Sequence, residues 1–151
     1  MVFSEYEEFE KKVKEIKKEN KKLLMIFESW LKNKGLTEKT TRKHIDNVEF
    51  FLIFFLCYYD PPTEAKDGWY EVDSFLGDFF IRKAMWSSPA QVKSNAASIK
   101  KFYACMLEEH HLIDKSEYKD LSETIKDELP NWVERSRRYD DENYSYDEIW
   151  V

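Results

Sequence analysis

Eight polar side chains, six of them cationic, follow two places at which the sequence predicts that a helix begins. The free backbone N–H groups of a helix start carry partial positive charge, so added cations are unfavourable there unless they share an anion. Backbone N–H groups and basic side chains together suit a chain of phosphates. The alternative is that these lysines are solvated on ordinary outer helix faces. The candidate DNA-binding residues are Lys39, Thr40, Arg42, Lys43, Lys93, Ser94, Lys100 and Lys101.

Capping signals define the two helices that carry these residues. Gly35 ends one helix as its C′ residue, and Thr37 caps the helix that contains the first cations. Residues 88–91 (Ser-Pro-Ala-Gln) form a capping-box signature with proline at the first helical position. In the helix that follows, the spacing places Lys93, Ala97, Lys100 and Ala104 on one stripe. The small alanines between the lysines would let a ligand surface come close to the backbone.

The positive charge of the chain is local. Residues 1–107 hold 18 Lys/Arg against 16 Asp/Glu, a net of +2, whereas residues 108–151 hold 6 against 14, a net of −8. The total of −6 argues against simple binding to any acidic polymer, but the distribution matters more than the sum. No acidic residue interrupts the stretch from Arg82 to Lys101, which contains five basic residues.

Composition predicts an all-α fold with one domain. The 151 residues are 42% hydrophobic and 17% aromatic, which provides enough material for a core. Only three glycines and four prolines occur, so there is little material for hairpin turns. Cys57 and Cys105 each lie in an apolar helical pattern and are expected to be buried free thiols, although their spacing leaves a disulfide open.

The first segment has the pattern of a long amphipathic helix. Its apolar positions alternate spacings of three and four residues, with the polar Asn20 at one of them, as in a coiled-coil seam. A parallel homodimer would oppose like charges across this seam, which favours docking of the helix on its own domain over self-association. A break near Asn20 is an alternative. The seam consists of Val2, Tyr6, Phe9, Val13, Ile16, Asn20, Leu23, Phe27 and Trp30.

Four further elements are expected after the first cationic helix. That helix should become apolar on every side from Phe50, as a central buried helix would be. Residues 60–68 have turn chemistry, and a shorter helix follows over residues 73–83. Asp114 and Glu117 form another capping box, and Pro130 is expected to break or restart the helix that follows. Residues 139–151 form an acidic, aromatic tail.

Two sequence motifs resemble the N-terminal core-binding domain of tyrosine recombinases and phage integrases. Residues 27–51 match its Phe-x-x-Trp-Leu helix end, its Gly-Leu-Thr turn and the basic start of its next helix. Residues 98–103 (Ser-Ile-Lys-Lys-Phe-Tyr) are similar to the end of its fourth helix. The similarity covers about residues 23–137. It implies a SAM-like orthogonal bundle of four to five helices that packs against one side of a DNA duplex.

The recombinase catalytic residues are absent from this chain. The family's catalytic domain carries an arginine, a His-x-x-Arg pair and a nucleophilic tyrosine, whereas residues 108–115 (EEHHLIDK) contain no arginine at that spacing. Tyr139, Tyr144 and Tyr146 lie in the tail, with no group nearby in sequence to activate them. The adjacent His110 and His111 and the two cysteines also lack metal-ligand spacing. We therefore expect no enzyme activity, no metal and no cofactor.

These observations predict an all-α, SAM-like bundle in three parts: residues 1–21 as an N-terminal helical extension, residues 22–138 as an integrase core-binding-like domain, and residues 139–151 as an acidic aromatic tail. The leading hypothesis is a non-catalytic, cytoplasmic module that binds the phosphates of double-stranded DNA through two basic helix starts. The alternative is a protein–protein interaction module that acts through the N-terminal helix and the acidic tail, without DNA. No membrane partner is expected, because the apolar run at residues 50–59 is too short to cross a bilayer.

Overall fold

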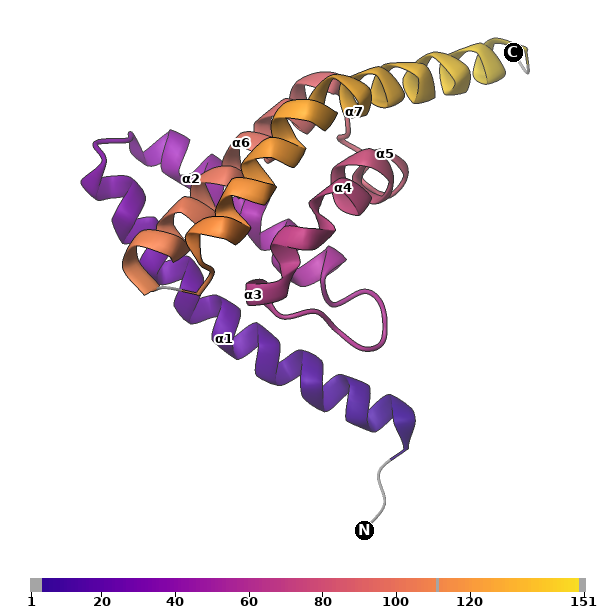
Figure 1. Cartoon of the computed structure of the whole chain (residues 1–151). Coiled ribbons are helices and arrows are strands. Elements are labelled where there is room, and N and C mark those ends of the chain that lie inside the picture. The colour runs from indigo at the N-terminus through magenta and orange to yellow at the C-terminus, as the bar shows by residue number, and fades with distance from the viewer. Residues whose placement is uncertain (1–3, 111, 150–151) are drawn as a thin grey trace.

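The computed structural model describes residues 4–110 and 112–149, so Val2 and His111 lie outside the described residues. Every regular element within these two ranges is helical, which confirms the all-α prediction (Figure 1); the SAM-like arrangement stays a prediction. The α-helices are α1 (Glu5–Asn33), α2 (Glu38–Glu49), α3 (Ala65–Gly68), α4 (Val72–Ser74), α5 (Phe80–Lys83), α6 (Pro89–Cys105) and α7 (Lys115–Ile149). Four wider or tighter helical segments adjoin them: η1 (Phe50–Phe55), η2 (Trp69–Glu71), η3 (Phe75–Phe79) and η4 (Met106–His110).

The predicted caps form as expected. The side chain of Thr37 accepts a hydrogen bond from the backbone N–H of Thr40 at 3.2 Å, and Gly35 has a φ of +84°. Ser88 caps α6 by accepting from the backbone N–H of Gln91 at 3.1 Å. These contacts stabilise helix ends through groups only a few residues apart. Local sequence therefore fixes where α2 and α6 begin.

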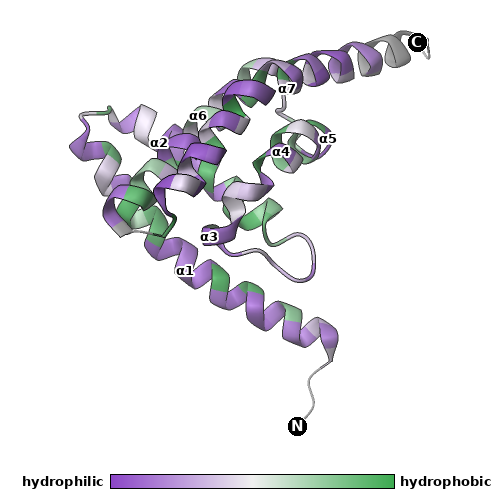
Figure 2. Cartoon of the chain, viewed as in Figure 1, coloured by the Kyte–Doolittle hydropathy of each residue, from purple (hydrophilic) through white to green (hydrophobic). Residues whose placement is uncertain are grey.

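Helix α1 is continuous through Asn20, so the alternative of a break is wrong. Its C-terminal half buries one face in the bundle, including Leu23, Phe27 and Leu31. Its N-terminal half projects from the bundle and shows alternating apolar and polar turns (Figure 2). Tyr6 near this end is 68% exposed. The helix therefore docks on its own domain along half of its length.

An aromatic core joins α1, α6 and the η segments. Phe27 meets Phe102 of α6 edge to face at 5.5 Å between ring centroids. Trp132 of α7 is fully buried, and its indole N–H donates to a carboxylate oxygen of Asp73 at 2.7 Å. Edge-to-face pairs and partnered indole groups are the favourable arrangement for buried aromatics. Cys57 and Cys105 are buried free thiols, as predicted.

The prediction of a helix break at Pro130 is wrong. Pro130 does not interrupt α7, which runs from Lys115 to Ile149 and includes residues 139–149 of the predicted tail. The side chain of Pro130 is exposed, whereas Leu121, Ile125 and Trp132 are buried on the face that packs on the core. Burial on both sides of the proline thus outweighs the hydrogen bond that its missing N–H removes.

The helix that follows α2 is not buried on every side. Phe51, Leu52 and Phe55 face the core, but Phe54 is 61% exposed and Tyr59 56%. The residues from Phe50 to Phe55 form a π-helical turn, whose wider spacing changes which side chains face inward. One side of this segment therefore presents aromatic groups to solvent.

Candidate nucleic-acid interface

Helices α2 and α6 pack against each other (Figure 1). His44 of α2 lies opposite Ser98 of α6, with 2.7 Å between the ring Nδ1 and the serine Oγ. One turn further along α2, Asn47 reaches back along α6 to Ser94, with 3.2 Å between Nδ2 and Oγ. Rising residue numbers on α2 therefore meet falling numbers on α6, which defines an antiparallel pair.

This antiparallel packing corrects one feature of the predicted site. The start of α6 lies near the end of α2, because Phe50, which directly follows α2, meets Trp86 with 5.1 Å between ring centroids. The two basic helix starts are therefore at opposite ends of the pair. The start of α2 therefore lies nearer to the C-terminal half of α6 than to its start. The basic residues in that half of α6 are Lys100 and Lys101.

A buried hydrogen-bond cluster holds the two helices in register. The Ser98 hydroxyl donates to the Ser94 backbone carbonyl at 3.0 Å and accepts from Asn47 Nδ2 at 3.0 Å. Its single proton is used in that bond, so His44 Nδ1 is the donor in the 2.7 Å contact. His44 is 4% exposed and Ser98 is fully buried. We call His44, Asn47, Ser94 and Ser98 the polar base.

Lys43 and Lys101 lie above this polar base, one from each helix. Both are exposed, and both act electrostatically on the His44 imidazole beneath them. Burial is the largest cause of the low pKa of His44, about 4, and the positive charges of Lys43 and then Lys101 lower it further. The imidazole is therefore neutral at pH 7, and the two ammonium groups share one electropositive surface.

Three further lysines extend this surface along the two helices. Lys39 precedes Lys43 by one turn of α2, and Lys100 and Lys93 lie on the stripe of α6 that also contains the exposed Ala97. Among the residues whose side chains the structure describes, none has a carboxylate within 4 Å of these amines or of those of Lys43 and Lys101. We define Lys39, Lys43, Lys93, Lys100 and Lys101 as the basic surface.

Three predicted site residues have other surroundings. Arg42 lies on the side of α2 that faces α1, where it is 4.0 Å from Asp46 and contributes to the lowered pKa of Glu28, after Lys32. Thr40 accepts a hydrogen bond from the Thr37 hydroxyl at 3.0 Å and is half-buried. Ser94 belongs to the polar base. These three are therefore separated from the basic surface or already engaged beneath it.

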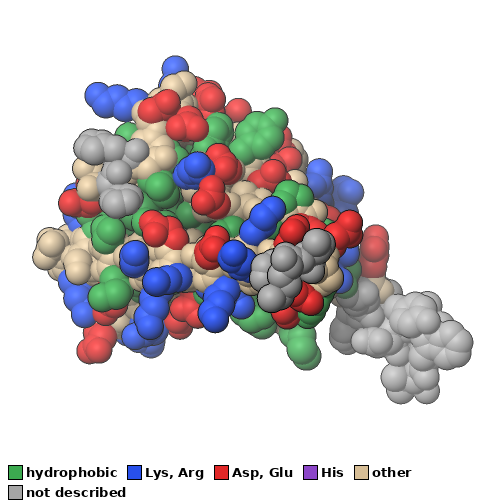
Figure 3. Space-filling view, turned by 90° about the horizontal axis from the view of Figure 1, so that it is seen from below, with side chains coloured by type: hydrophobic (Ala, Val, Ile, Leu, Met, Phe, Trp, Pro, Cys, Tyr) green, Lys and Arg blue, Asp and Glu red, His purple; other side chains and the backbone are tan. Residues whose placement is uncertain are grey.

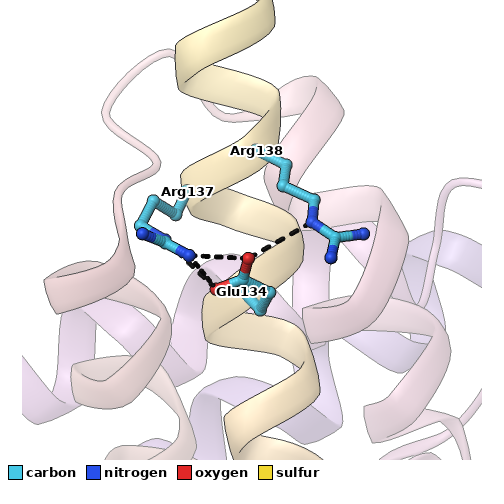
Figure 4. Close-up of polar contacts among 3 residues, drawn as sticks. All are labelled: Glu134, Arg137 and Arg138. Carbon is cyan, nitrogen blue, oxygen red and sulfur yellow. Dashed lines mark hydrogen bonds and ion pairs between the residues drawn. The ribbon is translucent and has the colours of Figure 1, made fainter.

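Several arginines of the chain are neutralised by neighbours. Arg137 and Arg138 of α7 both contact Glu134, with distances of 2.6 and 3.2 Å (Figure 4). Arg82 forms two hydrogen bonds with Asp78, at 2.7 and 2.9 Å. Arginine held in this bidentate way has little capacity left for an added anion. The basic surface differs from these sites because its lysines have no such carboxylate.

Asn47 was not among the sequence-predicted residues, although it connects the two helices that carry the basic surface. A sequence signal for it exists. His44 and Asn47 are three residues apart on α2, and Ser94 and Ser98 are four apart on α6, so each pair lies on one helix face. Two such polar pairs, each on a helix face that is otherwise apolar, are typical of a buried polar contact between the two helices.

The structure does not add a metal site or a membrane span to this interface. Within residues 4–110 and 112–149, no group of three or more histidine, cysteine, aspartate or glutamate side chains is arranged to hold a metal ion. In the same ranges, every helix is too short or too polar to cross a bilayer.

Comparison with known proteins finds no match among protein-family models, among curated proteins or among solved structures. The resemblance to a recombinase core-binding domain therefore depends on the two sequence motifs and on nothing else.

Proposed function

We propose that this chain is a non-catalytic DNA-binding module, resembling a recombinase core-binding domain, that binds duplex phosphates through its basic surface. One observation supports the proposal above all others: Lys43 and Lys101, from two different helices, are both close enough to the buried His44 for their charges to lower its pKa. A polar base with satisfied hydrogen bonds is rigid, so the two helices that carry these lysines are held in register before a ligand arrives.

The dimensions of the basic surface suit a phosphate chain. Lys93 and Lys100 are seven residues apart on α6, a rise of about 10 Å. Successive phosphates of one DNA strand rise about 3.4 Å along the duplex axis, so this stretch spans about three phosphates. The exposed Ala97 between them leaves room for a backbone to approach. Contacts of this kind bind any duplex sequence, because phosphates carry no sequence information.

Salt dependence of binding is the direct test. A fluorescently labelled duplex of about 30 base pairs should bind in an anisotropy titration, and affinity should fall as the salt concentration rises from 50 to 200 mM. Replacement of Lys43 and Lys101 by alanine should reduce the slope of log K against log salt by about 1.8, since each phosphate contact contributes about 0.9.

A matched variant separates this effect from a general loss of positive charge. Lys66 and Lys126 are also exposed and lie on α3 and α7, so their replacement by alanine makes the same charge change away from the basic surface. We expect that variant to keep the wild-type slope. Equal slopes for the two variants, or no salt-dependent binding by the wild type, would refute the proposal.

A further inference from the structure

The projecting half of α1 and the residues after α2 enclose an apolar groove. The groove has a volume of about 690 Å³, and its apolar lining comes from Tyr6, Phe9 and Val13 on one side and from Ile53, Phe54 and Tyr58 on the other. Tyr6, Phe54 and Tyr58 are 68%, 61% and 52% exposed. So many exposed apolar groups around one concavity are characteristic of a binding groove.

Lysines line one flank of the same groove. Lys14 and Lys17 belong to its lining together with one acidic residue, Glu10, and Lys18 and Lys21 continue the lysine stripe along α1. The stretch from Lys11 to Lys22 contains seven lysines and two glutamates. Seen from below, the molecule shows many basic side chains with acidic ones among them (Figure 3). Apolar groups beside a cationic flank favour an amphipathic, acidic partner.

The C-terminal segment of the chain has this chemistry. Asp140–Val151 contains five acidic residues and no basic ones, together with two tyrosines, isoleucine, tryptophan and valine. The backbone is helical as far as Ile149, so residues 140–149 extend over about 15 Å. The part of α1 that lines the groove, from Tyr6 to Lys17, extends over about 17 Å. The two lengths therefore match. The charges of the groove lining also suit an acidic helix, because Lys14 and Lys17 outnumber Glu10 there.

The segment cannot enter the groove of its own chain in this fold. Helix α7 is continuous and leaves the bundle at the end remote from the projecting half of α1 (Figure 1). Turning back would require several turns of helix to unwind. A second molecule faces no such requirement, because its C-terminal helix arrives already extended.

We propose that the acidic end of α7 of one copy, residues 140–149, binds the α1–η1 groove of a second copy. The lysines of the groove pair with its carboxylates, and its apolar side chains cover Phe54 and Tyr58. This self-association does not depend on DNA binding, because the groove and the basic surface use different lysines. Reciprocal exchange closes a dimer, whereas one-way insertion continues into a chain of molecules.

Sedimentation velocity of the full chain across a concentration series tests the proposal. The wild type should associate as its concentration rises. Truncation after Tyr139 and the double substitution Lys14→Glu with Lys17→Glu should each leave a monomer, with association weakened at least about tenfold. Neither defective protein should associate alone, but a mixture of the two should form a complex, since one supplies the groove and the other the helix.

Control variants make every outcome decisive. Lys12 and Lys22 lie on the same helix outside this groove, so Lys12→Glu with Lys22→Glu makes the same charge change and should leave association intact. Phe54→Ala should weaken association without lowering thermal stability, because Phe54 is largely exposed. A wild type that stays monomeric at every concentration would overturn the proposal. So would equal effects of the two lysine pairs, association that survives truncation, or a mixture that forms no complex.

Discussion

The basic surface on α2 and α6 and the groove between α1 and η1 are both rich in lysines, but the groups beneath those lysines differ. Lys43 and Lys101 lie above a polar base whose hydrogen bonds lock two helices together. Lys14 and Lys17 flank an open apolar cavity on a helix that projects from the bundle. Cations on a rigid polar base suit a ligand that is recognised by charge alone. Cations beside exposed aromatic rings suit a ligand that also buries apolar side chains.

The largest effect should come from reversing charge on the basic surface alone. Replacement of Lys43, Lys100 and Lys101 by glutamate should weaken duplex binding by about 100-fold or more, because repulsion is added to the loss of phosphate contacts. Self-association should stay unchanged, since the groove keeps its lysines. Anisotropy and sedimentation on the same protein measure both. Parallel loss of the two activities would show that the regions are not separate.

Removal of the Ser98 hydroxyl tests the rigidity of the polar base. Ser98→Ala leaves the buried His44 N–H without its acceptor, so the free energy of unfolding should fall by about 1–3 kcal/mol. Ser94→Ala is the matched control. Ser94 is only half-buried and its hydroxyl accepts a longer bond, so the loss should be smaller. Urea denaturation compares the two variants, and equal losses would mean that His44 does not depend on Ser98.

Acid should destabilise the α2–α6 pair through His44. Its pKa is about 4 in the folded chain and about 6.5 when unfolded, so the unfolded chain binds more protons between these values. Stability should therefore fall as pH drops from about 6.5 toward 4, by at most about 1.4 kcal/mol per pH unit. His44→Gln cannot titrate and should show a shallower fall in urea denaturation. Identical pH profiles would remove His44 as the cause.

Binding of duplex should also change the imidazole itself. A phosphate between Lys43 and Lys101 offsets the charges that help to lower the pKa of His44, so that pKa should rise on binding. An NMR titration of the imidazole with and without duplex measures the shift. No shift, despite binding, would place the DNA elsewhere on the molecule.

The smallest effect should follow deletion of Asp140–Val151. Because α7 carries this segment away from the bundle, duplex affinity should remain within about twofold of the wild type, which is the usual scale for a distant surface change. A marked gain in affinity would show that the acidic segment covers the basic surface in the intact chain, and the separation of the two regions would fail.

Local signals in the sequence predicted the helix starts. The relative direction of the helices and the exposure of their faces depend on long-range packing, so local signals could not predict them. The capping box of Asp114 and Glu117 forms with reciprocal bonds of 2.8 and 3.0 Å, because its groups are three residues apart. The direction in which α6 runs past α2 depends on the whole bundle, so the meeting of Lys43 with Lys101 could not be derived from spacing. The exposure of Phe54 was missed for the same reason, since an apolar run does not show which of its sides has a neighbour.

The unbroken path of α7 through Pro130 has a mechanical consequence. A single helix of 35 residues transmits orientation, so the direction of its far end is set by where its first turns pack on the core. Two molecules joined through this rigid helix would hold their basic surfaces at one distance and one angle. On a DNA duplex, the fold itself would then set the spacing between the two bound molecules, whereas a flexible linker would leave that spacing variable.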